Sequence, residues 1–236
     1  MTQPIIVAAI IGGLVTLLVS GAGNFVLHRQ RQKFDERLAR LKFDFDVRLA
    51  ERKFELDRSL SDWKRKSDFA ESALTEFYEA QLRMSAIRSP MSFEHENTDR
   101  NGRDKEPEIV KQRRDSYYPV ARRARDNGEF FTGFYARRYK SVALFGAGAE
   151  QPFLMIWQAL HSVNIAAGML MRDYGAAEPN DNIQEQWRER IWEGLGEPDT
   201  IAVQVQEAVD QAEALFRPAI EVQPGAAADQ PDLGLE

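Results

Sequence analysis

Residues 34–66 read FDERLARLKFD, FDVRLAERKFE and LDRSLSDWKRK, three successive copies of one eleven-residue pattern. Eleven residues make three helical turns at about 3.67 residues per turn, so apolar residues on this period form a right-handed seam. The seam consists of Phe34, Leu38, Leu41, Phe45, Leu49, Leu56, Leu60 and Trp63, with Arg52 interrupting it. Since neither Pro nor Gly occurs between Asn24 and Ser89, the sequence predicts one helix that continues to about Arg88, where Ser89-Pro90 ends it.

A second apolar face runs along the same predicted helix, at Phe43, Val47 and Phe54. A long helix with narrow apolar stripes must pack against something, and two such faces suit an assembly in which each helix contacts two neighbours. The alternative is that the seam folds back on later helices of the same chain. Sustained repeats are typical of coiled coils, so self-association is the preferred interpretation. The charges between the stripes are interpreted as a solvated, ion-paired surface.

Residues 4–27 contain no charged side chain and are long enough to cross a hydrocarbon layer of about 30 Å as one transmembrane helix. No Lys or Arg precedes this segment, whereas residues 29–66 contain 13 basic and 8 acidic residues. Positive flanks stay in the cytoplasm. The sequence therefore predicts a bacterial inner-membrane protein with one span, its N-terminus outside and its C-terminus cytoplasmic. A cleaved signal peptide is the alternative, but its basic residues would precede the apolar segment.

One face of the predicted anchor carries small or weakly polar residues at every fourth position. These residues are Ala8, Gly12, Thr16, Ser20 and Asn24. This spacing lets transmembrane helices approach closely and form hydrogen bonds, so it favours association of the anchors. Two alternatives remain: such residues are common in any membrane helix, and the face could line a narrow pore.

The remainder of the chain predicts an all-α protein, with a helical stalk over residues 28–66, a cytoplasmic helical bundle over 67–220 and a disordered acidic tail over 221–236. We expect Trp157, Trp187 and Trp192 in the core, His161 as a satisfied core histidine, and Asp181 as a helix N-cap. After the helix that ends at Ser89-Pro90, the expected helices cover 107–127 with a kink or break near Pro119, then 129–145, 151–174, 181–195 and 199–216.

The stretch DFAESALTEFYEAQLRMSAIRSPMSFEHE, residues 68–96, follows one anchor and a charged helix. In this arrangement the chain resembles a group of uncharacterised bacterial single-pass membrane proteins with a helical cytoplasmic domain. The similarity is clearest in the phenylalanine-rich helix that ends in IRSPMSF and is looser through residue 174. The resemblance implies an inner-membrane helical protein, and it carries no activity and no catalytic residues.

No catalytic, cofactor-binding or metal-binding motif is found, so the sequence favours a protein that is not an enzyme and uses no cofactor. His95 lies between two glutamates on a loop, but no second ligand cluster at helical spacing accompanies it. Zero cysteines exclude disulfides and a lipoprotein anchor.

One basic and aromatic segment could bind an anionic partner. Its central arginines are Arg113, Arg114, Arg122, Arg123, Arg137 and Arg138. Such a patch could contact phosphates and stack on bases, but the formal net charge of -6 argues against general nucleic-acid binding. The preferred alternatives are that it packs on acidic helices of the same chain or faces anionic lipid.

Three functional hypotheses follow. The first is a membrane-anchored, self-associating helical scaffold or adaptor that holds cytoplasmic bundles near the inner membrane, with a homo-oligomer, the membrane and an unidentified protein as its partners. The second is an oligomeric membrane effector or pore-forming protein. The third is a membrane tether that binds nucleic acid through the basic and aromatic patch.

Overall fold

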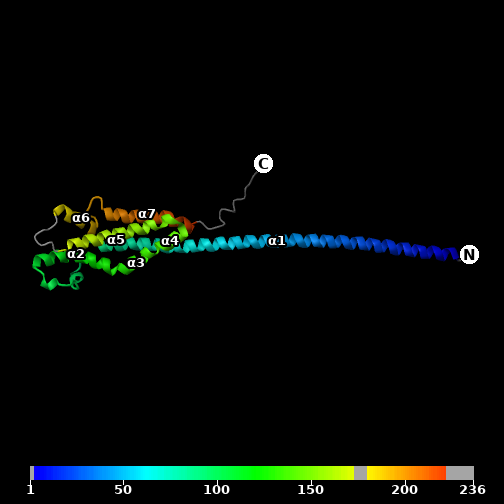
Figure 1. Cartoon of the computed structure of the whole chain (residues 1–236), viewed down its shortest axis with the longest axis horizontal. Coiled ribbons are helices and arrows are strands. Elements are labelled where there is room, and N and C mark those ends of the chain that lie inside the picture. The colour runs from blue at the N-terminus through cyan, green and yellow to red at the C-terminus, as the bar shows by residue number, and fades with distance from the viewer. Residues whose placement is uncertain (1–2, 173–179, 222–236) are drawn as a thin grey trace, which may run out of the picture. The chain divides into compact units, whose positions relative to one another are not determined.

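The computed structural model describes the backbone of residues 3–172 and 180–221, with side chains from residue 28 onward except that of Glu94. Its first element, α1, is a single helix from Gln3 to Arg88 (Figure 1). This confirms the predicted continuous helix and its end at Ser89-Pro90, because a residue that precedes a proline is restricted away from helical geometry. The side chains of the predicted membrane span, residues 4–27, lie outside the described residues, and so does its small-residue face.

The chain divides into two compact units between Leu60 and Ser61. In the first unit, the apolar side chains of the eleven-residue repeats are exposed to solvent. Their exposed fractions range from 49% at Leu60 to 69% at Leu41, and the second face at Phe43 and Phe54 is exposed to a similar extent. These side chains contribute nothing to the core of the single chain, so the reason for their apolar character must be sought outside it.

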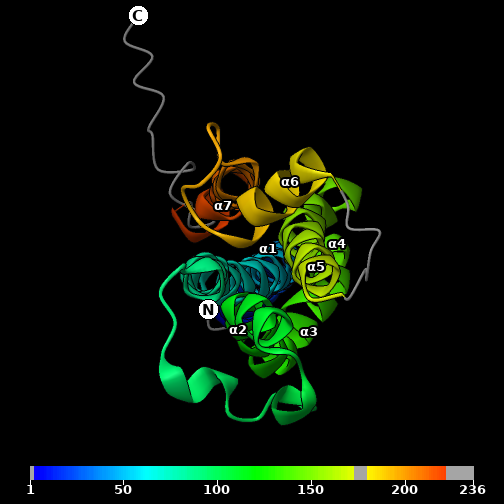
Figure 2. The same cartoon turned by 90° about the vertical axis from the view of Figure 1, so that its left-hand side faces the viewer.

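The second unit, here called the body, contains the last part of α1 and, in its described residues, six further α-helices. These are α2 (Glu108–Asp126), α3 (Gly128–Ala136), α4 (Arg138–Phe145), α5 (Gln151–Leu170), α6 (Asp181–Ile191) and α7 (Thr200–Glu221). No strand occurs in the described ranges, which confirms the all-α prediction. Viewed along the bundle, α6 and α7 lie on one side of α1 while α2 and α3 lie on the other (Figure 2).

Several helix boundaries differ from those expected. The segment 129–145, expected as one helix, forms two helices. α3 ends at Ala136 and α4 begins at Arg138, with Arg137 between them. Asn180, not Asp181, is the N-cap of α6, since its side chain accepts a hydrogen bond from the Ile183 amide. α2 continues through Pro119 without a break, because the proline is fully buried and its packing offsets the lost backbone hydrogen bond.

The far ends of two helices and one histidine also need correction. α6 ends at Ile191, before the expected residue 195. α5 ends at Leu170, and the expected end at 174 falls outside the described residues. His161 lies on the exposed face of α5, so it is not a core histidine. The three tryptophans at 157, 187 and 192 are partly buried and pack against the core, at its edge.

Among the residues whose side chains the structure describes, the stretch 147–170, which includes α5, is the one helical stretch long and apolar enough to cross a membrane, with a mean hydropathy of 1.4. Half of this stretch is buried inside the body, where Phe153, Ile156 and Val163 face the core. Its exposed face carries polar residues such as Gln158 and Asn164. A central helix of a bundle is apolar because other helices surround it, and the burial of α5 accounts for its composition.

Candidate functional site

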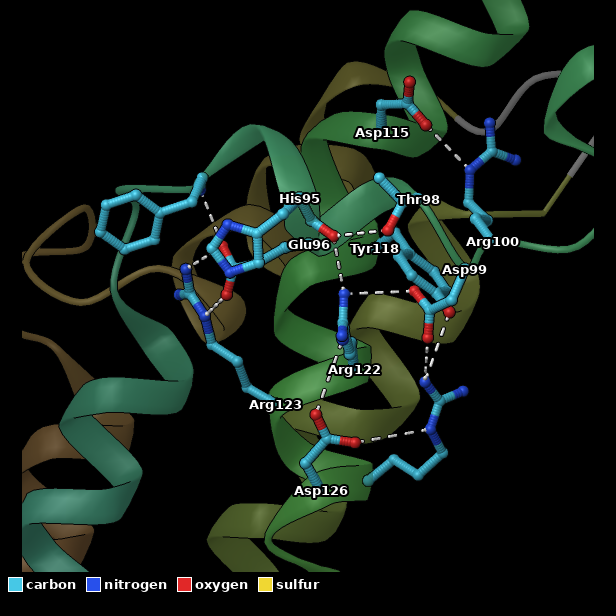
Figure 3. Close-up of polar contacts among 12 residues, drawn as sticks. His95, Glu96, Thr98, Asp99, Arg100, Asp115, Tyr118, Arg122, Arg123 and Asp126 are labelled. Carbon is cyan, nitrogen blue, oxygen red and sulfur yellow. Dashed lines mark hydrogen bonds and ion pairs between the residues drawn. The ribbon is translucent and has the colours of Figure 1, made fainter.

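A group of polar contacts in the body joins the loop between α1 and α2 to the arginine-rich face of α2 (Figure 3). The loop contains two short 3-10 turns, Glu94–Asn97 and Arg103–Lys105. Three of its carboxylates, those of Glu96, Asp99 and Glu106, contact arginines of α2. We call this group of contacts the loop network.

Arg123 is the centre of the loop network. Its Nε and Nη2 atoms donate to the two carboxylate oxygens of Glu96, each at 2.7 Å. Its Nη1 atom donates to the carbonyl of Ser89 at 3.0 Å, which ties α2 to the end of α1. The Glu96 carboxylate also accepts from the backbone amide of Phe93 at 2.9 Å. One guanidinium therefore holds the end of α1, the loop and α2 together.

The hydrogen bond from Arg123 is the main reason that the pKa of Glu96 is held below its ordinary value, and the Phe93 amide acts in the same direction against the effect of burial. A bidentate hydrogen-bonded pair between an arginine and a carboxylate is among the stronger polar contacts in proteins. Both side chains are mostly shielded from solvent, with 16% of Arg123 and 11% of Glu96 exposed. The pair is thus a structural element of the loop, not a freely solvated surface contact.

The outer part of the loop network is more exposed. Asp99 lies 3.3 Å from Arg122 as an ion pair and accepts a hydrogen bond from Arg125 at 3.3 Å, and Arg122 also donates to the carbonyl of His95 at 2.9 Å. Asp126 lies 3.6 Å from Arg122 one turn further along α2. Exposed pairs of this length each contribute little to stability because solvent screens them.

The inner part of the loop network is buried. Arg100 contacts Asp115 at 2.9 Å and Glu106 at 2.7 Å, and only 6% of its side chain is exposed. Arg103 also contacts Asp115 at 2.9 Å, and Arg114 pairs with Glu106. A buried charge is tolerated only when it is paired, and here each carboxylate has two arginine partners.

The loop network therefore holds the loop against α2 and does not indicate a catalytic role. Its carboxylates are engaged by guanidinium groups, and a reactive carboxylate would need a free oxygen facing a substrate. His95 is exposed and stacks on Phe93, with ring centroids 5.8 Å apart. Among residues 28–172 and 180–221, no group of three or more His, Asp or Glu side chains is placed to hold a metal ion.

The structure distributes the six arginines of the predicted anionic-partner patch over three places. Arg122 and Arg123 belong to the loop network, and so does Arg114 through its pair with Glu106. Arg113 and Arg114 donate to the carbonyls of Arg172 and Met171 at the end of α5, at 3.3 and 2.9 Å. Sequence alone does not reveal this arrangement, because the partners that occupy these arginines lie in other elements.

The last two arginines of the patch flank the junction of α3 and α4. Arg137 pairs with Glu76 and Ser72 of α1. The Arg138 guanidinium lies 3.6 Å from the ring centroid of Tyr135 and 4.1 Å from that of Tyr139, with no carboxylate partner among the described residues. Within the described residues, Arg138 therefore keeps its guanidinium on an aromatic surface.

An open groove of about 630 Å³ lies between α1 and α3. Glu76 and Glu79 line it from α1, Glu129 and Phe130 line it from α3, and Arg83 lies over the Phe130 ring at 4.4 Å. Burial raises the pKa of Glu76 above its ordinary value, despite the opposing effect of Arg137. The groove contains no nucleophile paired with a base, so its geometry does not indicate a reaction.

A scan against protein-family models finds no matching family, and searches of curated proteins and of solved structures find no matching protein or structure.

Replacing Glu96 by glutamine is expected to lower the free energy of unfolding at pH 7 by about 1.5 kcal/mol, the usual scale for a hydrogen bond to a charged group. Because the pKa of Glu96 is lowered in the folded state, its stabilisation is present above the unfolded-state value of about 4.3 and is lost as the pH falls through the folded-state value. Urea unfolding at pH 7 and in acid measures this. The difference in the free energy of unfolding between the wild type and Glu96→Gln should be smaller in acid.

The control for this change is Glu108→Gln. Glu108 is 66% exposed and lies 3.7 Å from Lys111, so its loss should leave the unfolding midpoint nearly unchanged. An equal loss of stability in both variants, or a loss for Glu96→Gln that does not depend on pH, would contradict a structural role of the Glu96–Arg123 pair.

Proposed function

We propose that the protein is a membrane-anchored, self-associating helical scaffold whose stalk holds the body at the cytoplasmic face of a bacterial inner membrane. The observation that carries this proposal is the exposed apolar seam of the stalk. Monomeric soluble proteins rarely expose a contiguous row of large apolar side chains, and such rows mark interaction sites. The body has its own complete core and does not need these residues.

The energetics favour association within a membrane. Burying a Phe or Leu fully is worth about 1.5–3 kcal/mol, and side chains that are already partly covered give about half of that. The seven Phe and Leu residues of the seam would then supply roughly 7 kcal/mol, which is comparable to the lost translational and rotational freedom on binding. Anchoring each copy in the same bilayer reduces that loss by raising the effective concentration.

The membrane part of the proposal rests on sequence. The uncharged segment 4–27 and the basic residues that follow it support one span with the body in the cytoplasm. The resemblance to bacterial single-pass membrane proteins supports the same topology. Small residues at every fourth position, centred on Gly12 and Thr16, support contact between the anchors.

The test is the mass of the full-length protein in mild detergent. Replacing Leu49 and Leu60 by lysine puts two charges into the seam, eleven residues apart, and is expected to convert the oligomer into monomers. The matched control places lysines at Glu51 and Asp62, which are also eleven residues apart but lie between the apolar faces, and should keep the oligomer. A monomeric wild-type protein would overturn the proposal.

The two other functional hypotheses have less support. A pore would depend on the anchor face from Ala8 to Asn24, whose side chains lie outside the described residues. A nucleic-acid tether would need the arginine patch to face solvent, yet Arg123 and Arg137 are engaged with carboxylates of the same chain. No observation on the described residues favours either hypothesis over the scaffold.

A further inference from the structure

We propose that the body binds a phosphate group in a pocket of about 410 Å³, formed by the first turns of α1 in the body together with α4. The pocket adjoins the groove beside α3 at Arg137. Every residue that lines it belongs to the body of one chain, so the proposal does not depend on self-association of the stalk. It assigns a ligand class to a place where the sequence indicated only a basic segment.

Three cations line this pocket. Arg65 comes from α1, Lys140 comes from α4, and Arg137 comes from the junction of α3 and α4. Asp68 is the one carboxylate among the lining residues, so the lining carries three positive charges and one negative charge. A hollow surface with an excess of one charge attracts ligands of the opposite charge. The pocket is therefore suited to an anion.

The fold holds two of these cations around one aromatic ring. The Arg137 guanidinium lies 5.3 Å from the ring centroid of Phe69, and the Lys140 ammonium lies 5.4 Å from the same centroid. Phe69 is only 2% exposed, so the core of the body fixes the ring between them. Like charges held near each other repel, and an anion bound between them replaces this repulsion by two attractions.

The guanidinium of Arg137 is fixed at the wall of the pocket by α1. It donates to the Glu76 carboxylate and to the Ser72 hydroxyl, and Ser72 lines the same pocket. Because this hydroxyl accepts the bond from Arg137, its own proton is available to an anion, and none of the described residues accepts it. Arg137 and Ser72 thus form a preorganised part of the site.

The other two cations are available to a ligand. Arg65 lies 3.7 Å from Asp62, and 67% and 53% of these two side chains are exposed, so solvent screens the pair and an anion can compete with it. Lys140 is exposed and has no carboxylate partner among the described residues. An anion that enters the pocket can therefore be contacted by both side chains without breaking a buried ion pair.

The donors and the size of the pocket indicate an organic phosphate. An arginine presents a planar fork of N–H groups and a lysine a compact charge, and both match phosphate oxygens. Pockets of about 300–1,000 Å³ hold small organic molecules, so this one has room for more than the phosphate group. Leu144 supplies an apolar wall for the organic part. The same chemistry is present in soluble phosphate esters and in phospholipid headgroups.

Calorimetric titration of the full-length protein in a neutral detergent tests the proposal with three probes. Phenyl phosphate joins a phosphate to a small apolar ring, benzoate joins the same ring to a carboxylate, and dihexanoyl phosphatidylglycerol carries the phosphate of an anionic lipid. We expect one phosphate-bearing probe to bind per chain. Benzoate should bind about tenfold more weakly or less, since it offers fewer oxygens and less charge to the donors.

The variant that removes the site combines Arg65→Gln with Lys140→Gln. Both side chains are exposed, so the urea midpoint of the body should be unchanged, while the affinity for the phosphate probe falls by about tenfold or more. The matched control combines Lys64→Gln with Lys66→Gln. It removes the same charge from exposed positions beside Arg65 that do not line the pocket, and should keep the affinity within about twofold.

The outcomes also identify the source of the phosphate. Binding of phenyl phosphate that the site variant weakens supports a soluble phosphate ester, and the same result with dihexanoyl phosphatidylglycerol alone supports a lipid headgroup. The absence of binding by both probes would overturn the proposal. Equal weakening by the two double variants would overturn it as well, because general positive charge would then attract the probe. Benzoate binding as tightly as phenyl phosphate would contradict a phosphate site.

Discussion

Replacing Arg88 by methionine is expected to lower the free energy of unfolding of the body by about 3–5 kcal/mol, the usual cost of removing one partner of a buried ion pair. Arg88 is the last residue of α1 and only 2% of it is exposed. Methionine is similarly long and flexible, so the change removes the charge and its hydrogen bonds while keeping much of the packing.

The loss is large because Arg88 satisfies several buried acceptors at once. Its Nε atom donates to the carbonyl of Arg190 at 2.8 Å, and its Nη2 atom donates to those of Glu189 and Trp192 at 3.1 and 3.0 Å. These carbonyls lie at the end of α6, where no backbone amide of the same helix remains to pair with them. Arg88 also contacts Asp199 at 2.9 Å. Without it, these acceptors stay buried and lack this donor.

The pH dependence gives a second signature of the same interaction. Burial alone would raise the pKa of Asp199, but hydrogen bonds from the Gly194 and Ala202 amides and from Arg88 outweigh it and hold the pKa below its ordinary value. The resulting stabilisation is present above the unfolded-state pKa and is lost as the pH falls through the folded-state pKa. The difference in the free energy of unfolding between Arg88→Met and the wild type should therefore be smaller in acid.

Urea unfolding of the full-length protein in detergent, followed by tryptophan fluorescence, measures this effect. The matched control is Arg65→Met, earlier in α1, where the arginine is 67% exposed and lies 3.7 Å from Asp62 of the same helix. That change should cost less than about 1 kcal/mol. Similar losses from both variants would show that Arg88 acts only through its hydrocarbon part.

The elements that could be predicted from sequence are those determined by neighbouring residues. The end of α1 follows from Ser89-Pro90, and the helical body follows from apolar spacing without strand alternation. The wrongly predicted boundaries lie where neighbouring residues are almost equally suited to end or begin a helix. Asn180 and Asp181 are both good N-cap residues, and the structure uses the first. His161 was misplaced because its neighbours in the sequence are apolar, whereas the helix face it shares with Gln158 and Asn164 is exposed.

The polar sites could not be predicted, because their partners are distant in the sequence. The partners of Arg88 lie 101 to 111 residues away in α6 and at the start of α7. From sequence alone, the arginines of α2 look like a free basic patch. In the structure, the loop that precedes α2 packs against them and pairs with several of them. Charges along one segment indicate what it could attract, and only the fold shows that Glu96 already occupies Arg123.

Replacing Phe77 by alanine is expected to lower the free energy of unfolding of the body by about 4 kcal/mol, since removal of a buried phenyl ring loses its transfer energy and leaves a cavity. Phe77 is fully buried, and its ring centroid lies 4.9 Å from that of Phe134, 4.7 Å from Phe153 and 6.3 Å from Phe216. It therefore joins α1 to α3, α5 and α7, and no single neighbour can move to fill the space.

The informative comparison is with Phe45→Ala in the stalk seam, where the same atoms are removed from a side chain that is 66% exposed. Phe45→Ala should leave the urea midpoint of the body unchanged and should instead weaken the oligomer in detergent. Phe77→Ala should do the reverse, reducing the unfolding midpoint while the stalk still associates. If Phe45→Ala destabilised the body as much as Phe77→Ala, the seam would belong to the fold of the single chain and the scaffold proposal would lose its main support. The exposures argue against that outcome. Phe77 is buried and belongs to the core of the body, whereas Phe45 is 66% exposed and is free to contact another copy.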